Sequence, residues 1–168
     1  MLKLDVSWDE YHRSIELLAE QIHQSQWKFD RIICLARGGL RVGDILSRIF
    51  KQPLAVLAAR SYGGANQQER GKLLIANQIT MTGDKLGSRI LLVDDLVDSG
   101  VTLKQTTIWL RDLYPELEEL KTAVIWYKAA SIYIPDYYLS YLAQNPWINQ
   151  PFEKYDNYKL STADRNCP

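Results

Sequence analysis

Four short apolar runs, separated by stretches of other character, constrain the fold of this 168-residue chain most strongly. They cover residues 31–36, 54–59, 89–93 and 121–127. Apolar runs of this length are typical of strands buried inside a sheet. Two of the gaps hold expected helices, at residues 40–50 and at residues 101–114, the second closed by Pro115. This alternation predicts an α/β fold with a mostly parallel central sheet and helices on both faces.

Local signals add further elements and one long loop. Residues 7–10 have the S-x-x-E form of a capping box, and apolar residues then recur at steps of three and four, which predicts a helix. Residues 72–79 are expected to form another strand. Residues 61–71 are polar and glycine-containing, and a connection of this length within a compact domain suggests a functional loop. We expect one domain, with a core at about 28–128 and a small C-terminal hood mainly at 129–160.

Composition excludes several classes of protein. Lys and Arg together number 20, as do Asp and Glu, so the chain lacks the basic surplus of a general nucleic-acid binder. No apolar run is long enough to cross a bilayer, and the N-terminus lacks the apolar core of a signal peptide. The two cysteines form neither a disulfide framework nor a metal-ligand cluster. We therefore expect a cytoplasmic protein without a membrane or nucleic-acid partner.

The stretch LLVDDLVDSGVTL at residues 91–103 is the strongest functional signal. It follows a predicted strand at its carboxyl end, where open α/β sheets bind their ligands. A helix that starts near Val101 offers unpaired backbone N–H groups and the positive end of its dipole. Ser99 and Thr102 add hydroxyls, and Gly100 lets a ligand approach the backbone closely. These features predict a cradle for a phosphate group.

Three carboxylates crowd the same stretch. Asp94 and Asp95 could accept hydrogen bonds from a sugar diol, or hold Mg²⁺ directly or through water. Asp98 could act as a proton acceptor. The plainer alternative is a helix-capping turn with solvated acids, which the apolar strand before the acids and the small hydroxyl loop after them disfavour.

This stretch resembles the phosphoribosyl-diphosphate (PRPP) binding motif of the type I phosphoribosyltransferases. The resemblance implies that Asp94 and Asp95 hold the ribose hydroxyls. It also implies a 5′-phosphate site formed by Asp98, Ser99, Gly100, Val101 and Thr102.

Two weaker motifs gain meaning from this resemblance. Arg37 and Gly38 follow the first predicted strand and resemble the family's pyrophosphate-binding loop, in which fixed donors and Mg²⁺ stabilise the leaving group. Ser61 and Tyr62 open the long polar loop and are similar to the Ser-Tyr pair of the family's flexible catalytic loop. Closure of such a loop would keep water from the activated sugar.

The C-terminal part of the chain resembles the family's 6-oxopurine branch. In that branch a lysine at the position of Lys128 contacts the exocyclic oxygen of the base, and an ammonium donor prefers a carbonyl oxygen to an amino group. The P-D-Y-Y sequence at residues 135–138 and W-I-N-Q-P-F-E at residues 147–153 resemble segments of bacterial and archaeal xanthine/guanine/hypoxanthine enzymes. The resemblance implies that Trp147 and Ile148 pack on the purine, although either could instead be core of the hood. Phe152, where the branch has tryptophan, and the long connection at residues 139–146 depart from the pattern.

The resemblance implies an enzyme that transfers the phosphoribosyl group of PRPP to N9 of guanine, hypoxanthine or xanthine in purine salvage, with Mg²⁺. It further implies a homo-oligomer, either a dimer or a tetramer. Three alternatives stay open: a PRPP-sensing regulator on the same fold, a phosphoribosyltransferase for another base, and an aspartyl-phosphate receiver or hydrolase. The last has no use for the small hydroxyl loop.

Overall fold

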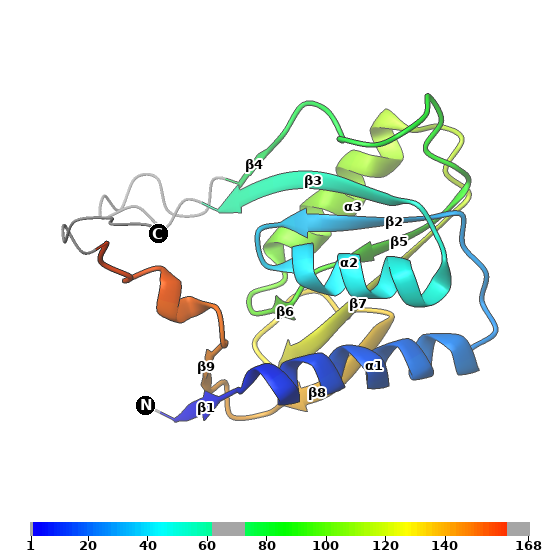
Figure 1. Cartoon of the computed structure of the whole chain (residues 1–168). Coiled ribbons are helices and arrows are strands. Elements are labelled where there is room, and N and C mark those ends of the chain that lie inside the picture. Colours follow the sequence, from blue (N-terminus) through cyan, green and yellow to red (C-terminus); the bar gives the residue numbers. More distant parts are fainter. Residues whose placement is uncertain (1, 62–72, 161–168) are drawn as a thin grey trace, which may run out of the picture.

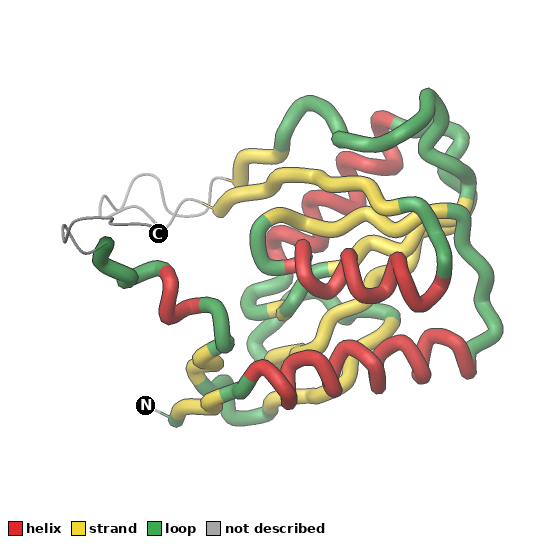
Figure 2. The backbone as a smooth tube through the Cα atoms, viewed as in Figure 1, coloured by secondary structure: helices red, strands yellow, loops and turns green. Residues whose placement is uncertain are grey.

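The computed structural model describes residues 2–61 and 73–160 (Figure 1). Figure 2 shows how helices and strands follow one another along this part of the chain. Its helices are α1 (Trp8–Gln24), α2 (Gly39–Phe50), α3 (Val101–Leu113) and a 3-10 helix, η1 (Glu153–Tyr155). Its strands are β1 (Lys3–Asp5), β2 (Arg31–Ala36), β3 (Leu54–Ser61), β4 (Leu73–Ile75), β5 (Arg89–Val93), β6 (Leu96–Val97), β7 (Glu119–Lys128), β8 (Tyr137–Leu142) and β9 (Trp147–Asn149).

The main sheet has the order β4-β3-β2-β5-β7, and both β6 and β8 pair with β7. Every pairing in it is parallel except the hairpin of β3 and β4. In Figure 1, α1 and α2 lie in front of this sheet and α3 lies behind it. The predicted α/β architecture is therefore confirmed.

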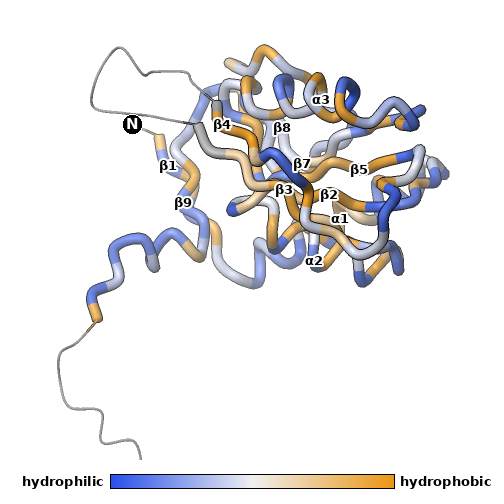
Figure 3. The backbone as a smooth tube through the Cα atoms, turned by 90° about the horizontal axis from the view of Figure 1, so that it is seen from above, coloured by the Kyte–Doolittle hydropathy of each residue, from blue (hydrophilic) through white to orange (hydrophobic). Residues whose placement is uncertain are grey.

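Both faces of the sheet are buried because alternate residues of its strands point in opposite directions. One face packs against α1 and α2, and the other packs against α3. The first face carries Ile32, Cys34, Leu91 and Val93, and the second carries Ile33, Leu35, Ile90 and Leu92. Figure 3 shows the hydrophobic central strands β2, β5 and β7 between more polar surroundings. This double burial explains why each run is apolar almost throughout.

Helix α1 begins as predicted. The Ser7 hydroxyl accepts a hydrogen bond from the Glu10 N–H at 3.2 Å, and the Glu10 carboxylate accepts one from the Ser7 N–H at 2.8 Å. This reciprocal pair is a capping box. The apolar face behind it is fully buried, at Tyr11, Ile15, Leu18 and Ile22.

Some expectations differ from the structure. The strand expected at 72–79 is only β4, because residues 77 and 78 bend the chain before Thr80 pairs with Val56. In the range expected for the hood, β8 adds a parallel strand beside β7, and β9 pairs with β1 in a separate two-stranded sheet. β8 thus belongs to the main sheet, although its residues fall in the range expected for the hood. Most of the predicted loop, including Tyr62, lies outside the described residues. Among the described helices, none is both long and apolar enough to span a bilayer.

Candidate active site

Asp94 and Asp95 interrupt a strand at the carboxyl end of the sheet. β5 pairs with β7 as far as Val93, and β6 resumes the pairing at Leu96. Between them the backbone stays tied to β7, because the Ile125 N–H donates to the Asp95 carbonyl at 3.0 Å. The two acids therefore occupy a fixed break in the strand, on the edge of the sheet where ligands of open α/β folds bind.

Both carboxylates accept hydrogen bonds from the protein. Asp94 accepts from the backbone N–H of Asp95 at 2.9 Å, and the backbone N–H of Gly39 acts to lower its pKa. Asp95 is 8 % exposed, and its two oxygens accept from the Leu96 N–H at 2.8 Å and from the Gln150 side-chain amide. Their orientation is therefore set before any ligand arrives.

The neighbouring carboxylates of Asp94 and Asp95 repel each other. Burial, and then the charge of Asp95, raise the pKa of Asp94 well above its ordinary value of 3.8. A sugar diol or a divalent cation would stabilise the charged pair. Carboxylate oxygens suit Mg²⁺, which commonly takes one or two carboxylates together with water and phosphate oxygens. The pair fits a PRPP-bound Mg²⁺ in this respect.

The loop before α3 is the one for which the sequence predicts a phosphate cradle. Gly100 has a φ of +80°, and a Cβ there would overlap the Ser131 hydroxyl and lie 2.7 Å from the Tyr133 nitrogen. The Ile132 N–H also donates to the Ser99 carbonyl at 2.9 Å, which fixes the loop against residues 131–133. As the N-cap of α3, Gly100 has no side chain to occupy the N–H groups of the first turn.

A cavity of about 190 Å³ opens at this loop, with room for about six waters at roughly 30 Å³ each. It brings together most of the residues that sequence predicted for PRPP, and Val101 begins the helix beside it. Its lining includes Asp94, Asp98, Ser99, Gly100 and Thr102.

The loop that joins β2 to α2 lies against the acid pair. A Cβ on Gly38 would lie 2.5–2.7 Å from three atoms of the Asp95 carboxylate, so only glycine fits there. The peptide bond between Ala36 and Arg37 is cis. The Arg37 side chain is 87 % exposed, and its nearest charged partner among the described residues is Asp156, at 3.5 Å. An exposed pair of this length holds Arg37 weakly and leaves it available to an anion.

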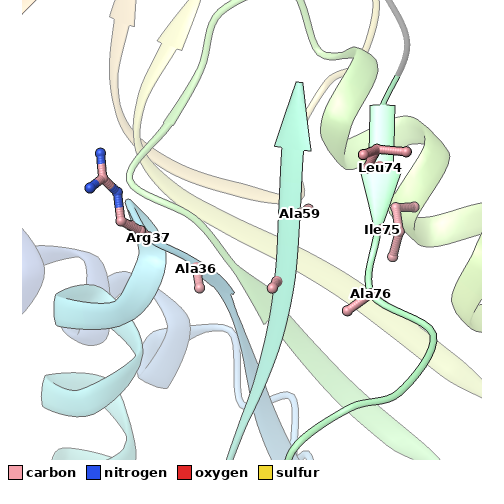
Figure 4. A pocket seen from close by; sticks show the side chains of 7 residues that line it. Ala36, Arg37, Ala59, Leu74, Ile75 and Ala76 are labelled. Carbon is pink, nitrogen blue, oxygen red and sulfur yellow. The ribbon is translucent and has the colours of Figure 1, made fainter. Parts of the chain in front are cut away.

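Arg37 also borders a larger cavity of about 630 Å³ beside β3 (Figure 4). The other lining residues come from β2, β3 and the β4 segment, and Figure 4 shows the Arg37 side chain extending away from them. Several are alanines, whose short side chains leave the space open. Ser61 ends β3 at this side of the molecule, in the hairpin with β4.

Lys128 and Asp98 come from different motifs and meet at the site. The Lys128 Nζ lies 3.3 Å from the Asp98 Oδ1. The lysine side chain is only 8 % exposed, whereas that of Asp98 is 63 % exposed. The pair therefore fixes a buried ammonium at the end of β7, next to the loop before α3.

The two predicted purine contacts occupy different environments. Trp147 on β9 is half exposed, whereas the neighbouring Ile148 is buried in the core that includes α1. The Ile148 side chain thus packs inside the protein, and its contact with a purine stays a prediction. Phe152 packs edge-on against Tyr11 at 5.7 Å between ring centroids and lies 4.4 Å beneath the Arg41 guanidinium.

Sequence reasoning missed two residues that hold the acids. The backbone N–H of Gly39 acts to lower the pKa of Asp94, and Gln150 donates its side-chain amide to Asp95. Gly39 is visible in sequence only as the second glycine of the loop. Gln150 lies in the W-I-N-Q-P-F-E segment at residues 147–153, at a position to which the resemblance assigns no role.

Residues 7–157 match the family of the phosphoribosyl transferase domain, and the chain belongs to this family. It is an enzyme of phosphoribosyl transfer. A xanthine-guanine phosphoribosyltransferase of Idiomarina loihiensis is 34 % identical over 155 residues, which cover 91 % of this chain and 88 % of that protein.

Solved structures of phosphoribosyltransferases have a similar fold. A purine phosphoribosyltransferase from Pyrococcus horikoshii has a TM-score of 0.74 and 31 % identity over 98 % of this chain and all of that one. A xanthine-guanine-hypoxanthine phosphoribosyltransferase of Helicobacter pylori has a TM-score of 0.76 and 26 % identity, and the match covers 92 % of this chain and 95 % of that one.

Proposed function

We propose that this protein transfers the 5-phosphoribosyl group of PRPP to N9 of a 6-oxopurine and releases pyrophosphate, in purine salvage. The contact between Lys128 and Asp98 carries this proposal. It places a buried cation and a carboxylate together beside the phosphate cradle, where the base must lie to reach the ribose. The names of the relatives support the same class of acceptor.

PRPP would span the features at the carboxyl end of the sheet. The 5′-phosphate would lie in the cradle before α3, and Asp94 and Asp95 would accept from the ribose hydroxyls. The pyrophosphate would face Arg37 and the backbone of Gly38, which lies against Asp95. Mg²⁺, held by the carboxylates directly or through water, would neutralise charge on the departing pyrophosphate.

The transfer forms one bond and breaks another. The N9 lone pair attacks C1′ of the ribose, and the electrons of the C1′–O bond leave with pyrophosphate through an oxocarbenium-like transition state. The purine loses a proton in the same process. Asp98 would accept or relay it near N7, and its exposed carboxylate has the access that this role needs.

Lys128 would select the base. Its ammonium can only donate, so it suits a carbonyl oxygen at position 6 and opposes the amino group of adenine. When the base enters, the ion pair between Lys128 and Asp98 must break, or both side chains must contact the base as well as each other. A purine that supplies both an acceptor for Lys128 and a proton for Asp98 replaces the pair without leaving a buried charge alone.

A turnover panel with PRPP, Mg²⁺ and either guanine, hypoxanthine, xanthine, adenine or uracil tests this function. We expect product from at least one 6-oxopurine and little from adenine or uracil. Preference for uracil would support the alternative of another base. Binding of PRPP without turnover of any base, together with binding of RNA or DNA, would support the regulator.

Two substitutions test the roles. Asp98→Asn should lower kcat by about 10²–10⁴ and weaken PRPP binding far less, because it removes the proton acceptor and the charge that pairs with Lys128 but keeps the shape of the side chain. Comparable turnover in that variant would exclude the role. Arg37→Ala should raise the KM for PRPP, and an unchanged KM would contradict a pyrophosphate contact. The homo-oligomer and the cytoplasmic location stay predictions, of which size-exclusion chromatography with light scattering tests the first.

A further inference from the structure

Gln150 makes a buried hydrogen bond to the acid pair from the far end of the chain. It is 5 % exposed, and its Nε2 donates to the Asp95 Oδ2 across 55 residues of sequence. Hydrogen bonds to a charged partner are among the stronger ones in proteins, because the acceptor carries a full charge. The contact is thus placed where it can fix the direction of the Asp95 carboxylate.

The orientation of the Gln150 amide is dictated by Asp95. A charged carboxylate only accepts hydrogen bonds, so the NH₂ group must face it and the carbonyl must face away. The Gln150 Oε1 then lies buried without a hydrogen-bond partner among the described residues. An unpaired buried carbonyl destabilises a fold. An apolar side chain would avoid this cost, so the amide is better explained by what it does for Asp95.

Other contacts leave Asp95 little freedom. Its second oxygen accepts from the Leu96 N–H at 2.8 Å, and Gly38 packs directly against the carboxylate. The three contacts come from three separate segments of the chain. Loss of the Gln150 bond would leave the Asp95 Oδ2 without this donor and free the carboxylate to rotate.

Gln150 is itself held firmly. It follows β9, which β1 fixes through the bond from the Trp147 N–H to the Leu2 carbonyl at 2.9 Å. The next bond, from the Val6 N–H to the Asn149 carbonyl at 3.1 Å, reaches the residue just before Gln150. The amide is therefore presented from a paired strand rather than from a free loop.

We propose that Gln150 is a positioning residue for PRPP: it holds the Asp95 carboxylate in the orientation that accepts the ribose hydroxyls. This inference rests on the proposed function only in assigning the ribose to Asp95. Gln150 contacts no reacting atom in this scheme. Its effect therefore falls on PRPP binding and not on the proton transfer at Asp98.

Two substitutions remove the donor in different ways. Gln150→Met keeps the length and removes both polar groups, whereas Gln150→Glu keeps the shape and replaces the donor with a negative charge. We expect the Kd for PRPP, from calorimetry with Mg²⁺, to rise about tenfold or more in Gln150→Met and further in Gln150→Glu. With saturating PRPP, kcat should stay within about threefold of the wild type, which a proton-transfer role would not allow.

Thr122→Val is the matched control. The buried Thr122 hydroxyl donates to the Asp136 carboxylate at 3.0 Å, near the opposite end of β7, so this variant also loses a hydrogen bond to a carboxylate. It should lower the melting temperature and leave the Kd for PRPP unchanged. Both variants losing PRPP affinity equally would indicate general loosening and overturn the proposal.

A double substitution tests the route through Asp95. In an Asp95→Ala background, Gln150→Met should cause no further loss of PRPP affinity, because its partner is gone. An equal loss in both backgrounds, or a wild-type Kd in Gln150→Met, would overturn the proposal. Failure of the proposed function would look different: the wild type would bind PRPP without turning over any 6-oxopurine, and the Kd comparison would still decide the role of Gln150.

Discussion

Gly38→Ala should damage the proposed PRPP site, because the added Cβ would clash with the Asp95 carboxylate. Gly38 has φ −55° and ψ −48°, which alanine adopts readily, so backbone strain adds nothing. The added Cβ, however, would lie 2.5 Å from the Asp95 Oδ1. An ordinary contact begins near 3.4 Å, so the carboxylate must move by about 0.9 Å.

A movement of this size breaks the hydrogen bonds that orient Asp95. The bond from the Leu96 N–H, now 2.8 Å, would lengthen to as much as about 3.7 Å, beyond hydrogen-bond range. Overpacking costs about 1–3 kcal/mol, and a lost bond to a charged group adds about 1.5–3 kcal/mol. With partial relaxation we expect the free energy of unfolding to fall by about 2–4 kcal/mol. A displacement near 1 Å should lower kcat/KM for PRPP by about 10².

The assay combines thermal unfolding with steady-state kinetics at varied PRPP. Gly83→Ala is the control, because its φ of +85° brings backbone strain while nothing lies within 4 Å of the added Cβ. It should lose stability and keep wild-type kinetics. Adding Asp95→Ala to Gly38→Ala removes the clashing atoms and should recover stability. A kcat/KM for PRPP within about threefold of the wild type in Gly38→Ala would refute the reasoning.

Three further predictions concern charge, capping and base choice. In EDTA, the contribution of Asp94 to the free energy of unfolding, measured with urea, should decline as pH rises above 3.8, because its raised pKa makes the folded state bind this proton more tightly than the unfolded state. Asp94→Asn should flatten that decline, and an unchanged slope would contradict it. Ser7→Ala should cost about 1 kcal/mol by removing the capping box, which is roughly 2–4 °C in melting temperature, with kcat unchanged. Lys128→Gln should narrow the ratio of kcat/KM for guanine over adenine, since an amide carbonyl can accept from the adenine amino group; an unchanged ratio would exclude Lys128 as the selector.

The central strands were predictable because each is buried on two faces. Such strands are apolar at nearly every position, and β2 and β5 coincide with the runs at 31–36 and 89–93. The small strands were not predictable. β1 and β9 have three residues each, too few to show a period, and the residues they pair are 144 positions apart.

The candidate site also has parts that the sequence could predict and parts that it could not. The gathering of Asp98, Ser99, Gly100 and Thr102 at one cavity before α3 was predictable because they are nearly consecutive in sequence, and their binding of a phosphate stays a prediction. The bond from Gln150 to Asp95 was not predictable, since only the completed fold brings them together. Ile148 shows a third case, in which an apolar residue suits a purine contact and a core position equally, and the structure places it in the core.

The pairing of β1 with β9 has a consequence for synthesis on the ribosome. At about 5–20 residues per second, translation of the 144 residues between paired positions takes about 7–29 s. During that time β1 has emerged without its partner, and Asp95 has been made without Gln150. A nascent chain that already contains the whole PRPP motif therefore still lacks the hydrogen bond that orients it. We expect the affinity for PRPP to rise when the segment from Trp147 to Gln150 joins the fold.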